Sequence, residues 1–210
     1  MATQLEYIEK AVGHPIYKIF DYIGGTSIGG ILALGCTGTL DGRNPICFAS
    51  DLVEIFEKYG TTIFPKTQYI NLVGLVNNKY SPNGIESVLK NYFKNCRISD
   101  VLKETNVVVT AVNRIDNRDM IFKSMDAILH RDKDYYMRDV ARATSAAPTY
   151  FSSAEIKNID ATIKHSLMDG GMGLNNPSKL VIDEIKKMAS NYGYENNYFL
   201  LSMGTGRLQT

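Results

Sequence analysis

The sequence has few cysteines and no long apolar run. The cysteines number only three in 210 residues, are far apart and form no Cys-x-x-Cys pair: Cys36, Cys47 and Cys96. This pattern argues against a disulfide framework or a zinc ribbon and favours a reducing compartment. No run of 18 apolar residues is present, and the amino terminus lacks a basic region followed by an apolar one. We therefore expect neither a signal peptide nor a transmembrane segment in this chain, and a location in the cytoplasm or peripheral to membranes.

A net charge of either sign is also missing. Lys and Arg number 23 against 22 Asp and Glu, a formal charge of +1, so no global field attracts nucleic acid. Internal repeats, low-complexity stretches and a linker rich in Gly or Pro are absent too. With 44% hydrophobic residues, the composition is that of a soluble globular protein. We expect residues 1–210 to form one domain with no nucleic-acid partner.

Helical and extended patterns alternate along the chain. Helices are predicted from the apolar periodicity at residues 5–12, 31–34, about 50–58, after Ser81-Pro82, and after Asn176-Pro177. Strands are predicted from short apolar runs, some of them β-branched, at residues 22–23, 107–112, 120–122 and 198–203. Strands interleaved with helices predict an α/β sheet with helices on both faces.

A glycine cluster lies between the first predicted strand and the helix that follows it. Gly25-Thr26-Ser27-Ile28-Gly29 has the form Gly-x-Ser-x-Gly, which in this context predicts a nucleophile elbow. We expect strained dihedrals at the serine, and glycines at both flanking positions because side chains there would collide with the strand and the helix. The amide of Ile28 is the nearest candidate donor to an oxyanion. The simpler interpretation is a glycine-rich turn that packs strand on helix; the spacing fits neither a Walker A nor a dinucleotide fingerprint.

A serine nucleophile needs a partner that accepts its proton. The sequence offers three histidines, His14, His130 and His165. His165 is the best placed of them, since it would be the last member of a Ser, Asp, His order. Its orienting carboxylate would be one of three candidates among which the spacing does not select: Asp116, Asp119 and Asp139.

The other candidate base is Asp169, which follows an apolar stretch and precedes Gly170 and Gly171. A carboxylate is ordinarily a weak base, so a direct Ser–Asp dyad requires a partly desolvated Asp within hydrogen-bonding distance of the hydroxyl. The simpler interpretation is that Asp169 begins a tight turn.

Four blocks of the sequence closely resemble the patatin-like phospholipases, in the order of that family. The blocks are residues 20–30, residues 141–151, Asp169-Gly170-Gly171 with Asn175-Asn176-Pro177, and residues 202–206. The resemblance implies a three-layer α/β/α fold with a mainly parallel central sheet. It also implies a serine acyl hydrolase with Ser27 as nucleophile and Asp169 as base, which leaves His165 without a catalytic role. The implied substrates are acyl esters of glycerophospholipids and related lipids at a membrane interface, with no metal or cofactor in the chemistry.

The sequence departs from the family at its beginning. Family members carry a loop of the form Asp-Gly-Gly-Gly-x-Arg/Lys-Gly upstream of the elbow, whose backbone N–H groups bind the oxyanion. This chain has no such segment, and residues 5–8 look like the helix that would follow it. We therefore expect a fold truncated at the amino terminus, with the carboxyl terminus past Gly206 open to the same interpretation, and weak or no activity for this chain alone.

Three functional interpretations remain open on the sequence. The first is the lipid acyl hydrolase with a Ser27–Asp169 dyad, the second an esterase with His165 as base, and the third a non-catalytic lipid-binding or regulatory homologue. We expect the block Arg142–Phe151 to support the site rather than to take part in chemistry. Apolar residues in and beside the stretch before Ser81 could form an acyl groove or a membrane-facing lid, although core packing explains most of them: Phe56, Phe64, Tyr69, Ile70, Leu72 and Leu75.

Overall fold

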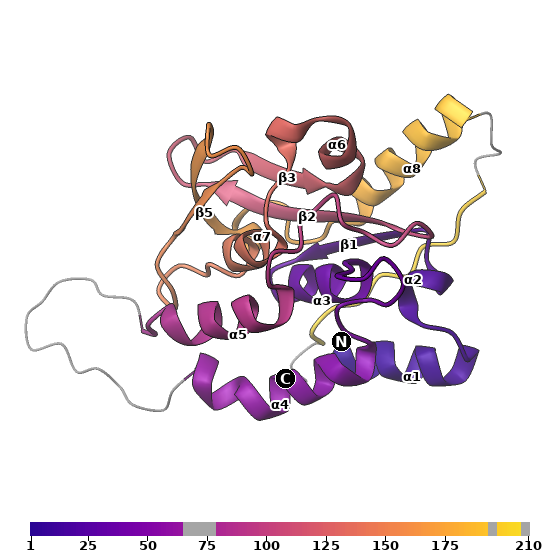
Figure 1. The fold of residues 1–210 in the computed structure, drawn as a ribbon, viewed down its shortest axis with the longest axis horizontal. Helices are drawn as coiled ribbons and strands as arrows, with labels where there is room; N and C mark the ends of the chain where they lie inside the picture. Colours follow the sequence, from indigo (N-terminus) through magenta and orange to yellow (C-terminus); the bar gives the residue numbers. More distant parts are fainter. Residues whose placement is uncertain (65–78, 193–196, 207–210) are drawn as a thin grey trace, which may run out of the picture.

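The computed structural model describes residues 1–64, 79–192 and 197–206, and Figure 1 shows their arrangement. The strands are β1 (Tyr22–Thr26), β2 (Asn106–Asn113), β3 (Asp119–Lys123), β4 (Ala154–Lys157) and β5 (Lys164–Asp169). The helices are α1 (Ala2–Val12), α2 (Ile16–Ile19), α3 (Ile28–Thr37), α4 (Ala49–Ile63), α5 (Asn83–Phe93), α6 (Ser124–Leu129), α7 (Met137–Thr144) and α8 (Ser178–Tyr192), with short 3-10 turns η1 (Arg131–Lys133) and η2 (Gly170–Met172). The predicted α/β class is confirmed.

The sheet is mixed rather than mainly parallel. Within the described ranges, β1 pairs with β2 in parallel, whereas the β2–β3, β2–β5 and β4–β5 pairs are antiparallel. The connections explain the difference. A parallel pair needs a long crossover, which α3, α4 and α5 provide between β1 and β2, whereas the short turns after β2 and after β4 can only reverse the chain.

Strands β1 and β5 lie along the same edge of β2. Thr110 of β2 pairs with Thr26 of β1, and the next residue, Ala111, pairs with Asp169 of β5. Both β2 residues also pair with β3, which therefore occupies the opposite edge. Strand β1 runs parallel to β2 and β5 runs antiparallel to it, so the two strands point at each other (Figure 1). Their carboxyl ends meet opposite neighbouring residues of β2.

Alternate residues of β2 face two different apolar clusters. Val107, Val109 and Ala111 belong to the main core, which packs against residues of α3, α4, α5 and α7. Val108 points to the other face and packs with Tyr22 and with Val181 of α8 in a smaller cluster. The continuous β-branched run was the signal of a strand buried on both faces, and this prediction is confirmed. Helices thus cover both faces of the sheet (Figure 1).

The first predicted helix ends where the sequence indicates. Helix α1 stops at Gly13, which adopts φ 76°, a left-handed conformation that glycine reaches without strain. The Gly13 N–H donates to the Glu9 carbonyl at 2.8 Å and so closes the last turn of the helix.

The strand predicted at residues 198–203 is wrong. The structure assigns no strand there, and Phe199 is 84% exposed. An apolar run becomes a strand only when another backbone pairs with it, and within the described residues no strand pairs with this segment. Four of the residues named as an acyl groove or lid lie outside the described residues: Tyr69, Ile70, Leu72 and Leu75. Among the helices that the structure describes, none combines the length and apolarity needed to cross a bilayer.

Candidate active site

Ser27 lies on a strained turn between β1 and α3. Its φ of 57° and ψ of −127° fall in a region that side-chain-bearing residues rarely adopt, as the elbow predicts. Gly25 permits this turn because a Cβ at that position would lie 2.2 Å from the Gly29 carbonyl oxygen. The strand therefore approaches the start of its own following helix too closely for any side chain at position 25.

The second glycine of the motif, Gly29, was expected to avoid a collision with a neighbouring element, and this expectation is wrong. A Cβ on Gly29 would meet nothing within 4 Å, so Gly29 borders open space rather than a neighbouring element. The close approach occurs one residue later, at Gly30, where a Cβ would lie 2.8 Å from Cγ2 of Thr144. Packing of α3 against α7 thus depends on Gly30, and the space beside Gly29 stays free next to the serine turn.

The side chains of Ser27 and Asp169 meet, although they are 142 residues apart in sequence. The Ser27 hydroxyl donates to Asp169 Oδ2 at 2.6 Å, and the Gly171 N–H donates to Asp169 Oδ1 at 2.7 Å. Asp169 is only 6% exposed. Burial raises the pKa of its carboxyl, and the two hydrogen bonds, which stabilise the ionised form, offset part of that rise. A desolvated carboxylate bonded directly to the hydroxyl is the arrangement that a Ser–Asp dyad requires.

The backbone around Asp169 fits closely against β2. A Cβ on Gly170 would lie 2.4 Å from the Thr110 carbonyl oxygen, so only glycine allows the chain to turn there. The Thr110 and Thr26 hydroxyls lie 2.8 Å apart, and Thr26 Oγ1 donates to the Leu174 carbonyl at 2.9 Å. These buried hydroxyls connect the strand before Ser27 with the loop after Asp169.

The beginning of α3 supplies free backbone amides beside Ser27. The N–H groups of Gly30 and Ile31 donate to the Ser27 carbonyl. Those of Ile28 and Gly29 make no hydrogen bond within the part of the chain that the structure describes. The first amides of a helix lack intrahelical acceptors and lie at the positive end of its dipole. Ile28, the donor predicted from the sequence, is therefore available to an oxyanion, and Gly29 is equally so.

The structure does not bring His165 to Ser27. His165 lies on β5 four residues before Asp169, which separates the two by about 13 Å along the strand. Its Nε2 is instead 3.0 Å from the hydroxyl of Tyr135. Burial lowers the pKa of His165. This residue therefore belongs to the packing around Tyr135.

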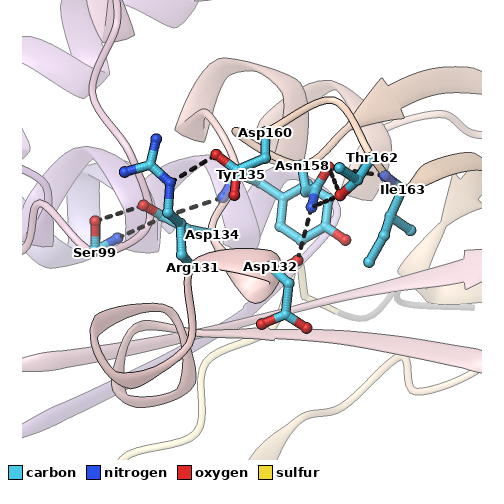
Figure 2. A network of polar contacts seen from close by, with 9 residues as sticks. All are labelled: Ser99, Arg131, Asp132, Asp134, Tyr135, Asn158, Asp160, Thr162 and Ile163. Carbon is cyan, nitrogen blue, oxygen red and sulfur yellow. Dashed lines mark hydrogen bonds and ion pairs between the residues drawn. The ribbon is translucent and has the colours of Figure 1, made fainter.

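A polar network secures the chain on either side of Tyr135 (Figure 2). The buried carboxylate of Asp134 accepts hydrogen bonds from the N–H and hydroxyl of Ser99, at 3.2 and 2.8 Å, and from the Tyr135 N–H at 3.0 Å. The buried amide of Asn158 donates to the Asp132 carbonyl and accepts from the Ile163 N–H. The network joins the segment before α7 to the turn between β4 and β5. It therefore holds Tyr135 and its partner His165 in a structural contact away from Ser27.

The other residues considered for a histidine-dependent site are also dispersed. His14 and His130 are exposed. Asp116 lies in the turn between β2 and β3, Asp119 begins β3, and Asp139 lies in the first turn of α7. Within the described residues none of these carboxylates hydrogen-bonds to a histidine, so no Ser-Asp-His arrangement forms.

Three threonines at the site were not predicted from the sequence. Thr26 and Thr110 form the hydroxyl pair described above, and Thr144 accepts the Ser27 N–H at 2.8 Å. Thr144 lies in the block Arg142–Phe151, which was expected to support the site. Arg142, 5% exposed, donates to Glu86 and to the Ser152 carbonyl and so joins α7 to α5 and to the chain before β4. The available signal was the presence of small hydroxyl residues beside alanines, which does not say what each hydroxyl contacts.

An apolar cavity of about 30 Å³ lies among α3, α4 and α5. Ile31, one turn after Ser27, lines it together with Phe56 of α4 and Phe93 of α5. Phe56 packs against the main core, as the simpler interpretation of this residue expects. Phe64, by contrast, is 40% exposed and lies 5.3 Å from the ring of Tyr80 and 5.8 Å from that of Phe151, centroid to centroid.

Comparisons with known proteins find similar sequences among patatin-like proteins and a phospholipase. A cGAMP-activated phospholipase of Pseudomonas aeruginosa is 34% identical over 191 residues, which cover 88% of this chain and 52% of that protein. Patatin-like protein 2 of Arabidopsis thaliana is 29% identical over 207 residues, covering 89% of this chain and 50% of that protein. Probable inactive patatin-3-Kuras 1 of Solanum tuberosum is 27% identical over 218 residues, covering 97% and 56%.

The chain spans about half the length of the curated relatives it matches. The family model described as "Patatin-like phospholipase" matches residues 2–182, which include β1 with the Ser27 turn, α7 and β5 with Asp169. Sequence match and fold agree, and the chain belongs to the patatin-like phospholipase family.

Proposed function

We propose that this chain is the acyl-hydrolase unit of a patatin-like phospholipase, which cleaves fatty acyl esters of phospholipids or related lipids through an acyl-serine intermediate. One observation carries the proposal: the Ser27 hydroxyl donates at 2.6 Å to a carboxylate that is 6% exposed. A hydrogen bond of this length places donor and acceptor within range of proton transfer. The raised pKa of Asp169 makes that carboxylate a better base than an exposed aspartate.

The proposed reaction has two halves. Asp169 accepts the hydroxyl proton as Ser27 Oγ forms a bond to the ester carbonyl carbon, and the ester C–O bond breaks as the proton passes to the leaving alcohol or lysolipid. In the second half Asp169 takes a proton from water, whose oxygen attacks the acyl carbon. The Ser27–acyl bond then breaks, the serine recovers its proton, and the fatty acid leaves.

The developing negative charge needs donors on the side of α3. The unbonded amides of Ile28 and Gly29 are positioned for this role at the start of the helix, where the dipole favours an anion. The open space beside Gly29 leaves room for the substrate carbonyl to approach these amides. We place Gly25 and Gly170 in a different role, that of allowing the two chain segments to come together.

The proposed substrate is a lipid in a membrane or another aggregate. The family name and the phospholipase named among the relatives support this class. Exposed apolar side chains follow both residues of the dyad in sequence, Ile28 at 38% directly after Ser27 and Met172 at 60% three residues after Asp169, and they are suited to an apolar interface. A protein peripheral to membranes fits this substrate.

The proposal is tested by covalent labelling and by product release. The wild-type chain should react with a fluorophosphonate probe, with the label mapped to Ser27 by mass spectrometry, and should release fatty acid from phosphatidylcholine vesicles. Both rates should be low, because this chain has no Asp-Gly-Gly-Gly-x-Arg/Lys-Gly loop to donate further N–H groups to the oxyanion. Ser27→Ala should abolish the label and the release, and Asp169→Asn should lower both by at least about 10³-fold. His165→Ala serves as the matched control and should retain both, because His165 contacts Tyr135.

Two outcomes would reject the proposal. Loss of labelling in His165→Ala with normal labelling in Asp169→Asn would identify a histidine-dependent esterase instead. No label on the folded wild-type chain, together with binding to lipid vesicles, would identify a non-catalytic lipid-binding homologue.

A further inference from the structure

A single short segment contacts both halves of the proposed dyad. This segment, Thr144 to Ala146, consists of the last residue of α7, its C-cap Ser145 and the residue that follows. The Ser27 backbone N–H donates to Thr144 Oγ1 at 2.8 Å, and the Asp169 backbone N–H donates to the Ala146 carbonyl at 3.0 Å. The backbones of Ser27 and Asp169, 142 residues apart, are thus hydrogen-bonded to two residues that are only two positions apart.

The Thr144 contact acts on the strained residue of the turn. A left-handed φ such as the 57° of Ser27 costs about 1–3 kcal/mol and persists only where the surroundings enforce it. The Thr144 oxygen does so by fixing the direction of the Ser27 N–H. Thr144 has no exposed surface, so bulk water does not compete for this hydrogen bond.

Packing fixes the position of the Thr144 oxygen. Its Cγ2 lies against the bare Cα of Gly30, where a Cβ would come within 2.8 Å. One residue later the Ser145 hydroxyl donates to the Ala141 carbonyl at 2.7 Å, and the Ala146 N–H donates to the Ala143 carbonyl at 3.2 Å. The end of α7 is therefore closed by its own hydrogen bonds, and both anchors belong to one rigid unit.

We propose that Thr144 is a positioning residue: its hydroxyl oxygen holds the Ser27 backbone so that the serine Oγ stays within hydrogen-bonding distance of Asp169. The inference rests on the proposed function and assigns Thr144 no contact with substrate. It also removes one group from the oxyanion site. Because the Ser27 N–H is bonded to Thr144, only the amides of Ile28 and Gly29 remain at the start of α3.

Two substitutions at position 144 isolate the oxygen from the methyl group. Thr144→Ser keeps Oγ and removes Cγ2, whereas Thr144→Ala removes both. Thr144→Ala should lower the rate of fluorophosphonate labelling and kcat for ester hydrolysis by about 10- to 100-fold, with KM within about 3-fold, because misplacement of a reacting atom affects the chemical step. Thr144→Ser should stay within about 3-fold of wild type in both.

Thr37 provides a matched control for the loss of a buried threonine hydroxyl. Like Thr144, Thr37 has no exposed surface. It lies in α3, and its hydroxyl donates at 2.8 Å to the Ala33 carbonyl of the same helix. Thr37→Ala and Thr37→Ser should change the midpoint of thermal unfolding as much as the Thr144 pair does. Neither should change kcat or the labelling rate by more than about 3-fold.

The pH profile gives a readout that lost stability alone would not move. The hydrogen bond from the Ser27 hydroxyl lowers the pKa of Asp169. In Thr144→Ala the displaced serine would weaken that bond, so the acidic limb of kcat/KM should move to higher pH. In Thr144→Ser the limb should stay where it is in the wild type.

An exchange measurement separates this inference from the proposed function. The Ser27 amide proton should exchange slowly in the wild type and in Thr144→Ser, and faster in Thr144→Ala, as followed by NMR. A wild-type chain that takes no label would reject the proposed function, while amide exchange would still test the Thr144 contact. A labelled wild type in which the Ala and Ser variants are equally slow, change only KM, or leave the Ser27 amide protected would overturn the inference.

Discussion

At the residue scale, the site depends on the charge state of one buried carboxyl. The ionised carboxylate of Asp169 accepts two hydrogen bonds, from the Ser27 hydroxyl and from the Gly171 N–H. In the folded chain its pKa lies above the usual value of 3.8, because burial penalises the charged form more than the two hydrogen bonds favour it. The reaction needs Asp169 in its ionised form, and burial in the fold disfavours that form.

The first prediction is an acidic limb in the activity profile. The proposed reaction needs ionised Asp169, so kcat/KM should rise with pH through one ionisation whose midpoint lies above the usual 3.8 of an aspartate. Initial rates on a soluble ester between pH 3.5 and 8 would measure this limb. A midpoint at or below 3.8 would contradict the assignment of Asp169 as a desolvated base.

The second prediction concerns stability. A folded-state pKa above the unfolded one means that ionised Asp169 costs folding free energy once the pH exceeds the folded pKa. Asp169→Asn should therefore raise the free energy of unfolding at pH 7, by an amount of the order of 1 kcal/mol. This gain should vanish as the pH falls through the folded pKa. Urea unfolding at pH 7 and at pH 4 would measure both effects.

Asp41 provides a control of opposite sign. Hydrogen bonds from the backbone N–H groups of Asn44 and Arg43 lower the pKa of its carboxyl, so ionised Asp41 favours the folded chain. Asp41→Asn should lower stability at pH 7, and the loss should shrink as the pH falls through the depressed folded pKa. Equal shifts of the same sign in both variants would show that burial of Asp169 is not the cause.

Single residues at the site differ in how far the sequence predicts them. The Gly-x-Ser-x-Gly motif predicts the strained turn at Ser27. The family resemblance named Asp169 as its partner, and the two side chains are in contact. Thr144 could not be predicted in its role, because a hydroxyl in a helix leaves no periodic signal and its acceptor function depends on a chain turn 117 residues away. Gly29 shows the opposite case: the motif predicts the glycine, but the reason for it lies in open space that only the fold reveals.

At the element scale, the meeting of β1 and β5 creates the site. Two strands that point at each other along one edge of β2 bring their carboxyl ends together, opposite Thr110 and Ala111. Sequence patterns gave the strands β1, β2 and β3, but not this pairing, because a run of apolar residues does not encode its partner. The same limit explains the failed strand at residues 198–203, whose composition is that of a strand but which lacks a partner among the described residues.

The third prediction contrasts the two glycines of the serine turn. Gly25→Ala forces a Cβ to within 2.2 Å of the Gly29 carbonyl and should lower the free energy of unfolding by about 2–3 kcal/mol. Gly29→Ala enters open space in the first turn of a helix and should leave stability unchanged or raise it by up to about 1 kcal/mol. Thermal unfolding of the two variants would measure the contrast. Similar losses in both would mean that Gly29 does have a close neighbour.

At the scale of the whole molecule, the three cysteines report on the integrity of the fold. Each of the three is a free thiol, with no disulfide, and each is 2% exposed. Burial raises the pKa of Cys47 and of Cys96 to about 12, and raises that of Cys36 as well. A thiol reacts through its thiolate, and with these raised pKa values the native protein contains almost no thiolate at neutral pH.

The fourth prediction follows from these thiols. In the native chain at pH 8, Ellman's reagent should modify none of the three cysteines within minutes, whereas all three should react in concentrated urea. The increase in reactivity should follow the unfolding transition measured by circular dichroism. Rapid reaction of one thiol in the native chain would show an opening of the core near that residue.

The end-to-end arrangement of β1 and β5 has a consequence for how the molecule fails. Strand β5 joins β2 through three paired residues, and β1 joins it through five. Fraying of either short ladder separates alcohol from carboxylate while most of the core stays packed. The rate of turnover should therefore fall at denaturant concentrations where most of the protein is still folded, so loss of activity should precede global unfolding.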